Sequence, residues 1–293
     1  MSELRFEEVL PGTYLLKVPF GPVWTGIILV RGEKNILIDS SHEEPELHLL
    51  PALDALGIKV SDIDWLLNTH VHGDHIGGHH ALVTKYGLKC ATLDTSVDAL
   101  RDPVKVAIRV RTRFPKNSPA PQSYLKGVEP ALVLREGELL EGRFKAVSTP
   151  GHDDDCLCWI DTVTGTAFSG DSLQANGTPT QGIGFYRSLP DYRATLGKLA
   201  QLRLGNIVCG HDYDGIGNLI LGKDKVAEAL RYCEERIPLY EGKLREYLAD
   251  GMLIEEEPVQ LALRLIDDVG CGRPQSLFLA LHTVSEHLKE ICR

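Results

Sequence analysis

The chain has 293 residues, which is enough for one large domain or for a domain with an appendage. Its hydrophobic content of 43% and charged content of 25% are ordinary for a globular protein, which argues against a disordered chain. The net charge of −10 argues against a nucleic-acid partner, which would favour a basic surface.

The first eight residues contain no apolar signal core, and no apolar run approaches the length of a membrane span. We therefore expect a cytoplasmic protein without membrane contact. The seven cysteines are an odd number without the spacing of a disulfide framework, and we interpret them as free thiols of a reducing compartment.

In the first half of the chain, predicted strands alternate with predicted helices. A hairpin is predicted over residues 27–39, followed by a helix over 46–56 and a strand over 65–69. A short helix over 79–87 and a strand over 88–93 come next. This alternation favours a layered α/β domain. The second half repeats the order, with strands near 131–135, 143–149, 156–162 and 166–170 and a helix that starts near 188.

Residues 96–127 interrupt the predicted sheet as an insert. Seven basic residues lie in it: Arg101, Lys105, Arg109, Arg111, Arg113, Lys116 and Lys126. Such a stretch is often the solvated face of a helix followed by a proline-containing loop. In an acidic protein it could also attract a carboxylate or phosphate of the substrate.

The last part of the chain looks helical, with helices predicted over 225–248, 258–268 and 274–292. We therefore divide the chain into a catalytic domain, 1–222, and a helical C-terminal extension, 223–293. The last predicted helix carries Leu277, Leu281 and Leu288, which are apolar enough for internal packing or for a homodimer contact.

The most informative segment follows the apolar run Trp65-Leu66-Leu67 and contains four metal-binding side chains within six residues. It reads His70-Val71-His72-Gly73-Asp74-His75. Imidazole is the commonest zinc ligand in proteins, and carboxylate oxygens also bind zinc. Three later strand-like runs end near a similar side chain, with glycine just before it: His152, Asp171 and His211. If these strand ends converge on one edge of a sheet, they form a two-metal site.

These residues resemble the metallo-β-lactamase superfamily, and the resemblance spans roughly residues 13 to 215. The family pattern HxHxDH matches the segment from His70 to His75, and the later ligands occur in the family order. The resemblance implies an αββα sandwich with a first metal on His70, His72 and His152, a second on Asp74, His75 and His211, and Asp171 bridging the two. It also matches Asp39 to an aspartate that supports the ligands from behind.

The resemblance implies a metal-dependent hydrolase in which a hydroxide of the dinuclear centre cleaves an ester, thioester, lactone or amide bond of a small molecule. Asp74 would orient that hydroxide and carry its proton to the leaving group. Zinc suits the imidazole-rich site best, although iron and manganese bind similar sites. The stretch 69–78 is similar to the glyoxalase II and lactonase-like branches, but Gln174 stands where some lactonases have a catalytic tyrosine.

Two other functions remain open from the sequence. One is a mononuclear iron oxygenase that resembles persulfide dioxygenases and uses only His70, His152 and Asp171. The other is a ligand sensor that keeps the metal pocket without efficient turnover. The loops 20–24 and 172–187 could wall the pocket, with Trp24 and Tyr186 as candidate wall residues.

Overall fold

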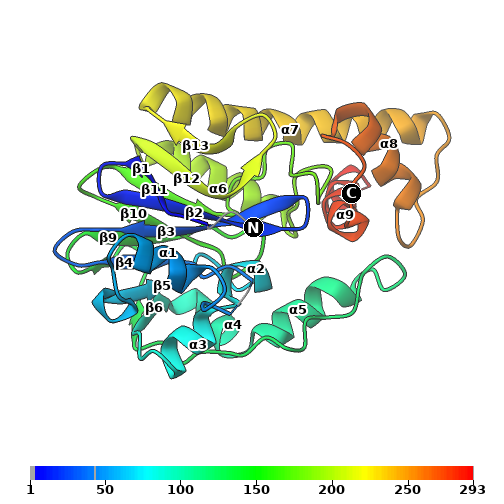
Figure 1. Ribbon diagram of the computed structural model, residues 1–293. Helices are drawn as coiled ribbons and strands as arrows, with labels where there is room; N and C mark the ends of the chain where they lie inside the picture. The colour runs from blue at the N-terminus through cyan, green and yellow to red at the C-terminus, as the bar shows by residue number, and fades with distance from the viewer. Residues whose placement is uncertain (1–3, 43, 293) are drawn as a thin grey trace.

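The computed structural model describes residues 4–42 and 44–292 and contains two β-sheets between layers of helices (Figure 1). The first sheet has seven strands in chain order: β1 (Glu7–Leu10), β2 (Thr13–Phe20), β3 (Val23–Val30), β4 (Ile36–Ile38), β5 (Trp65–Leu67), β6 (Cys90–Leu93) and β7 (Leu132–Leu134). The second has six, in the spatial order β13 (Gly217–Leu221), β12 (Asn206–Tyr213), β11 (Thr166–Gly170), β10 (Leu157–Asp161), β9 (Phe144–Ser148) and β8 (Leu139–Leu140).

Apolar side chains from both sheets fill the space between them. Ile28 and Ile38 of the first sheet belong to the same buried cluster as Trp159, Phe168 and Val208 of the second. The central strands β10 and β11 are buried at every position, because one face of their sheet meets the other sheet and the opposite face meets helices. This arrangement makes β-branched and aromatic residues favourable along these strands.

Helices cover the outer face of each sheet. The first sheet packs against α1 (Leu49–Ala55) and α3 (His79–Thr84), and the short 3₁₀ turn η1 (Val60–Asp62) leads into β5. The second sheet packs against α6 (Leu189–Gln201) and the first part of α7 (Lys223–Ala249). The two helical layers lie on opposite sides of the sheets in Figure 1. The predicted αββα sandwich is therefore confirmed.

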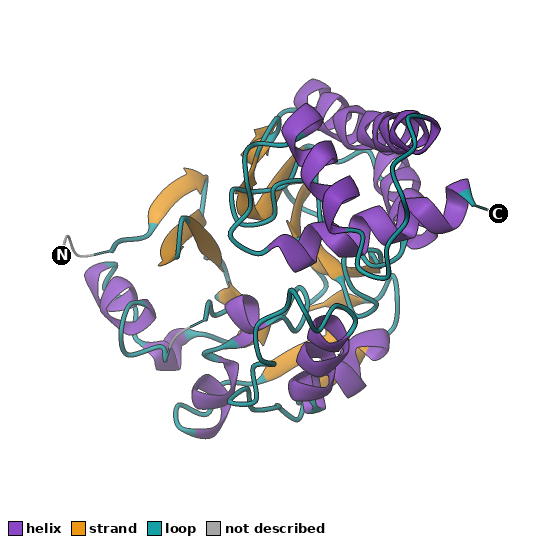
Figure 2. Cartoon of the chain, turned by 90° about the vertical axis from the view of Figure 1, so that its right-hand side faces the viewer, coloured by secondary structure: helices purple, strands orange, loops and turns teal. Residues whose placement is uncertain are grey.

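The predicted insert lies between β6 and β7 and contains η2 (Asp94–Ser96), α4 (Val97–Arg101) and α5 (Pro103–Thr112). It packs on the C-terminal helices α8 (Val259–Val269) and α9 (Leu277–Ile291), because Val106, Val110, Leu265 and Leu281 share one buried cluster. Figure 2 shows these C-terminal helices gathered on one side of the strands, with the N-terminus on the other side.

The predicted helical C-terminal region is confirmed, and its apolar residues have an internal partner. Leu281, Val284 and Leu288 are buried against α5 and α7 within this chain. Packing therefore accounts for these three residues, and a homodimer stays a prediction. Within the described residues, no helix combines the length and the apolar character that crossing a membrane requires.

Candidate metal centre

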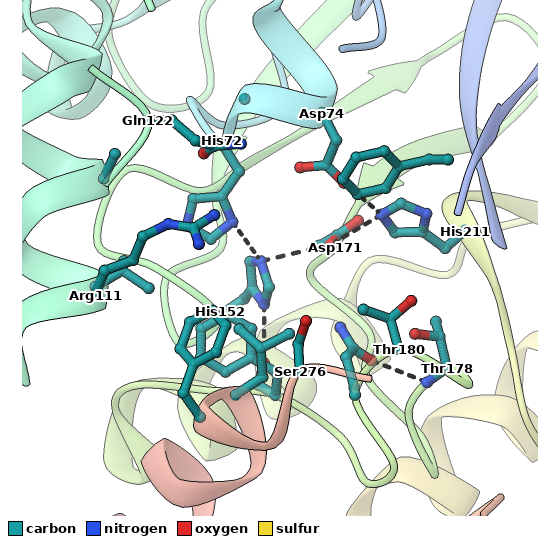
Figure 3. A pocket seen from close by; sticks show the side chains of 18 of the residues that line it. His72, Asp74, Arg111, Gln122, His152, Asp171, Thr178, Thr180, His211 and Ser276 are labelled. Carbon is teal, nitrogen blue, oxygen red and sulfur yellow. Dashed lines mark hydrogen bonds and ion pairs between the residues drawn. The ribbon is translucent and has the colours of Figure 1, made fainter. Parts of the chain in front are cut away.

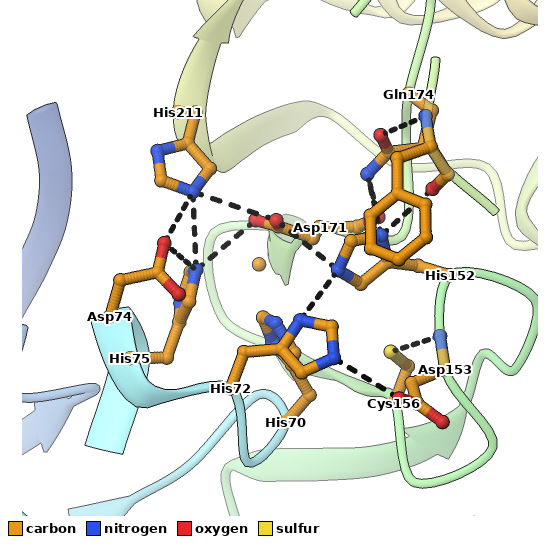
Figure 4. Close-up of polar contacts among 12 residues, drawn as sticks. His70, His72, Asp74, His75, His152, Asp153, Cys156, Asp171, Gln174 and His211 are labelled. Carbon is orange, nitrogen blue, oxygen red and sulfur yellow. Dashed lines mark hydrogen bonds and ion pairs between the residues drawn. The ribbon is translucent and has the colours of Figure 1, made fainter. Parts of the chain in front are cut away.

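The side chains of all seven predicted ligands meet at one edge of the sandwich (Figure 4). Their ligand atoms fall into three groups, each within 4.8 Å: His70, His72 and His152; Asp74, His75 and His211; and His70, His75 and Asp171. The first two groups coincide with the two ligand sets that the resemblance implies. Five of the seven side chains are buried, and only His72 and Asp74 are partly exposed.

Asp171 lies between the two groups. Its carboxylate oxygens are 3.3 Å from Nε2 of His75, 3.5 Å from Nε2 of His152 and 3.5 Å from Nε2 of His211. Ring nitrogens also lie close together within each group: Nε2 of His152 is 3.0 Å from Nδ1 of His72, and Nε2 of His75 is 3.3 Å from Nε2 of His211. A carboxylate in this position has one oxygen available for each group.

Four segments carry these side chains to the same edge. After β5 the chain leads through His70 and His72 into the short helix α2 (Gly73–Ile76), which holds Asp74 and His75. His152 lies four residues beyond β9, and Asp171 directly follows β11. The strand that was expected to end at His211 extends two residues further, because β12 continues to Tyr213. The pairing of β12 with β13 is irregular between Val208 and Tyr213, which includes His211.

At two positions directly before a ligand, only glycine fits, because a neighbouring segment lies too close for a side chain. Gly170 has a φ of 49°, and a Cβ there would lie 2.3 Å from Oγ1 of Thr69, the residue before His70. A Cβ at Gly210 would lie 2.7 Å from both Oδ1 of Asp171 and Cε1 of His75. A side chain at either position would therefore push the ligand-bearing segments apart.

Each histidine directs one ring nitrogen into the centre and holds the other in a contact outside it. The outer contacts are His70 Nδ1 to Thr69 Oγ1 at 3.2 Å, His72 Nε2 to Asp153 Oδ2 at 3.0 Å, His75 Nδ1 to Asp39 Oδ2 at 2.8 Å, His152 Nδ1 to the Phe185 carbonyl at 2.8 Å, and His211 Nδ1 to the Trp24 carbonyl at 2.7 Å. Such outer contacts fix the tautomer and the ring orientation of metal-binding histidines. Asp39 therefore lies where the resemblance places it, behind His75.

Asp153 supports His72 and was not singled out from the sequence. Its side chain is fully buried, and besides His72 it forms ion pairs with Arg109 and Arg187. The acidic run that directly follows His152 was a signal for such a residue. The sequence could not show which of the three aspartates faces His72, because the partners lie 34 to 81 residues away.

Gln174, at the position of a tyrosine in some lactonases, holds the polypeptide behind the centre. Its Nε2 donates to the Asp171 carbonyl at 2.7 Å, and its Oε1 accepts from the Phe185 backbone N–H at 2.8 Å. The side chain is fully buried and does not line the cavity. It therefore connects the segment of Asp171 to the segment that supports His152.

The donors fit metal ions. Among the described residues, the buried Nε2 of His70 has no hydrogen-bond partner, although it points toward the other donors. Burial lowers the pKa of His70 well below its ordinary value and that of His152 to about 4, so both rings are neutral, the form that binds metals. Burial alone would also lower the pKa of His75, but Asp171, Asp74 and Asp39 raise it well above normal. These carboxylates therefore favour a positive charge at this place.

A cavity that is open to solvent leads to the centre (Figure 3). His72, Asp74, His152, Asp171 and His211 all line it. Its walls come from the loop 20–23, from the insert, from the loop 178–185 and from the start of α9. The C-terminal region thus supplies part of the wall, which the sequence did not indicate.

The loops predicted to wall the cavity do so, but through other residues than the two candidates. Phe20 and Val23 line the cavity, whereas the Trp24 side chain does not. Phe185 lines it, whereas Tyr186 is buried and its hydroxyl lies 2.5 Å from Nε2 of His287. Trp24 and Tyr186 are therefore wrong as wall residues. In each loop the neighbouring apolar residue faces the cavity instead.

Comparison with known proteins agrees with this geometry. A protein from Caenorhabditis elegans named beta-lactamase-like protein 2 homolog is 27% identical over 270 residues, which cover 91% of this chain and 77% of that protein. Its namesake from Drosophila melanogaster is 29% identical over 193 residues, which cover 66% of this chain and 58% of that protein.

A solved structure with the same fold is a metallo-beta-lactamase family protein from Thermus thermophilus. It superimposes with a TM-score of 0.71 at 22% identity and covers 97% of this chain and 94% of its own. The family model of the metallo-beta-lactamase superfamily matches residues 18–211, which contain all seven converging side chains. The chain therefore belongs to the metallo-beta-lactamase superfamily.

Proposed function

We propose that this protein is a metal-dependent hydrolase that holds two divalent ions, with zinc preferred, and cleaves an ester, thioester, lactone or amide bond in a small molecule. The observation that carries the proposal is the pair of three-residue donor groups with Asp171 between them. In this proposal His70, His72 and His152 hold one ion, Asp74, His75 and His211 hold the other, and Asp171 contacts both.

Bound in this way, two divalent ions would supply a nucleophile from water at neutral pH and polarise the bond that is cleaved. The chain's own residues orient the reaction. The five histidines are oriented by their outer contacts, and the apolar side chains of Phe20, Val71 and Phe185 line part of the cavity beside them. No separate serine or cysteine nucleophile is required.

Asp74 is the proposed proton carrier. Its Oδ2 lies 3.2 Å from Nε2 of His211, and its carboxylate also faces the cavity. In the metal-free chain burial favours the protonated form, but the positive charges of His75 and His211 hold the pKa of Asp74 far below its ordinary value. When neutral His75 and His211 hold a divalent ion, the charge of that ion would favour the carboxylate in the same way. The carboxylate is therefore ionised at neutral pH and can accept a proton before it passes it to a leaving group.

The test is a screen of the purified full chain against esters, thioesters, lactones and amides, with metal content measured first. We expect about two metal equivalents and turnover of at least one substrate class. Asp74→Asn is expected to lose about 100-fold to 10,000-fold in kcat while metal is retained. Asp212→Asn, which removes the same charge from an exposed residue beside His211, should keep wild-type turnover.

Other outcomes would replace the proposal. One iron equivalent together with oxygen uptake on thiol or persulfide substrates would identify a mononuclear oxygenase. Bound metal without turnover of any substrate class would identify a sensor. Unchanged activity in Asp74→Asn would contradict the role of that carboxylate.

A further inference from the structure

Three arginines lie at alternate positions, two in the last turn of helix α5 and one directly after it, and two of the three are neutralised by acidic partners. Arg109 forms ion pairs with Asp153 and Asp154, and Arg113 lies 3.1 Å from Oε1 of Glu286. Arg111 lies between them in sequence and forms no ion pair with any carboxylate in the described part of the chain. Structural ion pairing therefore explains the first two arginines but not Arg111.

Arg111 projects into the cavity that leads to the metal centre. Figure 3 shows its guanidinium pointing from α5 toward the side of the cavity that holds His72 and His152. The guanidinium carbon lies 5.4 Å from the centroid of the Phe278 ring, a contact that holds the group in place. Partial burial lowers the pKa of Arg111, but a guanidinium stays charged at any physiological pH.

The walls around Arg111 are mainly apolar and uncharged. Val110 and Phe278 adjoin it, Val71, Leu125 and Leu279 also line the cavity, and the polar side chains among the lining here, Gln122 and Ser276, carry no charge (Figure 3). The nearby carboxylate of Asp74 belongs to a donor group of the centre, where His75 and His211 surround it. Among its described lining residues, the cavity thus presents one arginine without an ion-pair partner, within a largely uncharged surface beside the place where a bond would be cleaved.

We propose that Arg111 binds a carboxylate carried by the substrate, so that the hydrolase acts on acyl compounds with an apolar body and one anionic end. This inference rests on the proposed function. The planar guanidinium fork matches the two oxygens of a carboxylate. A single arginine balances one negative charge, and the overall charge of −10 disfavours a doubly charged phosphate or a polyanion.

The kinetic test uses the metal-loaded full chain and two esters of equal length. p-Nitrophenyl hydrogen glutarate ends its acyl chain in a carboxylate, whereas p-nitrophenyl pentanoate ends it in a methyl group. We expect wild type to prefer the glutarate ester by about 10-fold to 100-fold in kcat/KM, the effect of one charge-assisted contact. In Arg111→Gln this ratio should fall toward 1, mainly through KM.

Two further variants serve as comparisons. Lys105→Gln removes the same charge from an exposed position of α5 outside the cavity, so it should keep the wild-type ratio. Arg111→Lys keeps a positive charge without the planar fork and should retain part of the preference. Equal ratios in wild type and Arg111→Gln, or no preference for the anionic ester in wild type, would overturn the proposal.

A binding measurement separates this inference from the hydrolase itself. Calorimetric titration of the metal-loaded chain with 4-phenylbutyrate and with 4-phenylbutan-1-ol requires no turnover. We expect 4-phenylbutyrate to bind at least about 10-fold more tightly to wild type than to Arg111→Gln, with the alcohol much less affected. That result would support the carboxylate site even if neither ester were hydrolysed. Equal affinity of 4-phenylbutyrate for both chains would overturn it.

Discussion

The carboxylate of Asp39 lies 2.8 Å from Nδ1 of His75 and connects the end of β4 to the segment that carries four of the seven converging side chains. The same carboxylate accepts hydrogen bonds from the backbone N–H of Thr69 at 2.8 Å and from its hydroxyl at 2.7 Å. Asp39 has a φ of 61°, which aspartate tolerates better than most residues. One side chain thus fixes both the start of the segment and the ring of His75.

Replacing Asp39 by asparagine should weaken metal binding at the group of Asp74, His75 and His211. The amide keeps most of the volume but loses the charge that orients the His75 ring, and we expect a loss of about 10-fold to 100-fold in metal affinity. Competition with a chromophoric chelator measures this affinity. Asp54→Asn, an exposed substitution in α1, is the matched control and should bind metal as wild type does. Equal affinity in Asp39→Asn and wild type would refute the positioning role.

Metal removal should lower thermal stability. The carboxylates of Asp74 and Asp171 face the buried imidazoles of His75, His152 and His211. An ion that binds the folded chain but not the unfolded chain stabilises the folded chain by about 4 kcal/mol when its concentration is 1,000 times its Kd. For a chain of this size the corresponding rise in Tm is about 7 °C per ion. Scanning calorimetry with zinc and with chelator measures it. His211→Gln should show a smaller rise than wild type, and a Tm that zinc does not change would argue against a metal centre.

Local patterns in the sequence predicted a layered α/β domain and candidate ligands after strands, and the family resemblance implied the αββα sandwich and the full set of seven side chains. Alternating strands and helices, and polar residues placed directly after apolar runs, are visible within short windows such as Trp65 to His75. The residues that position the ligands were harder to predict from the sequence. Asp153 contacts His72, which lies 81 residues earlier in the chain. Gln174 accepts a hydrogen bond from the Phe185 backbone N–H, and the conformation of the loop between them brings the two together.

The walls of the cavity were the least predictable feature. Phe278 comes from α9, almost at the end of the chain, and Arg111 comes from an insert whose basic residues all looked alike in the sequence. Only the tertiary structure distinguishes Arg111 from its neighbours, because Arg109 meets Asp153 and Asp154 of the loop after β9 and Arg113 meets Glu286 of α9.

Asp153→Asn should destabilise the folded chain. The buried carboxylate pairs with Arg109 and Arg187 and contacts His72, and an amide cannot balance these charges. Removing one charge from a buried ion-pair network typically costs about 3–5 kcal/mol. Urea unfolding of metal-free chains measures the difference. The neighbouring Asp154 is largely exposed, and among the described residues its ion pair is with Arg109, so Asp154→Asn should cost less than about 1 kcal/mol. Similar losses in the two variants would refute this account of Asp153.

Acid should destabilise the chain through two buried histidines of α9 that lie outside the metal centre. Nε2 of His282 lies 2.9 Å from the Val110 carbonyl, and burial lowers the pKa of His282 and of His287 to about 3. In the unfolded chain both would titrate near 6.5, so between about pH 6.5 and pH 3 the unfolded chain binds protons that the folded chain does not. Stability should therefore fall as the pH falls through this range, by up to about 1.4 kcal/mol per pH unit for each histidine.

Urea unfolding of the metal-free chain at pH 7, 6 and 5 measures how steeply the free energy of unfolding depends on pH. His282→Gln keeps a donor for the Val110 carbonyl and should reduce this slope by the contribution of one proton. An unchanged slope in that variant would mean that His282 does not contribute to the acid sensitivity.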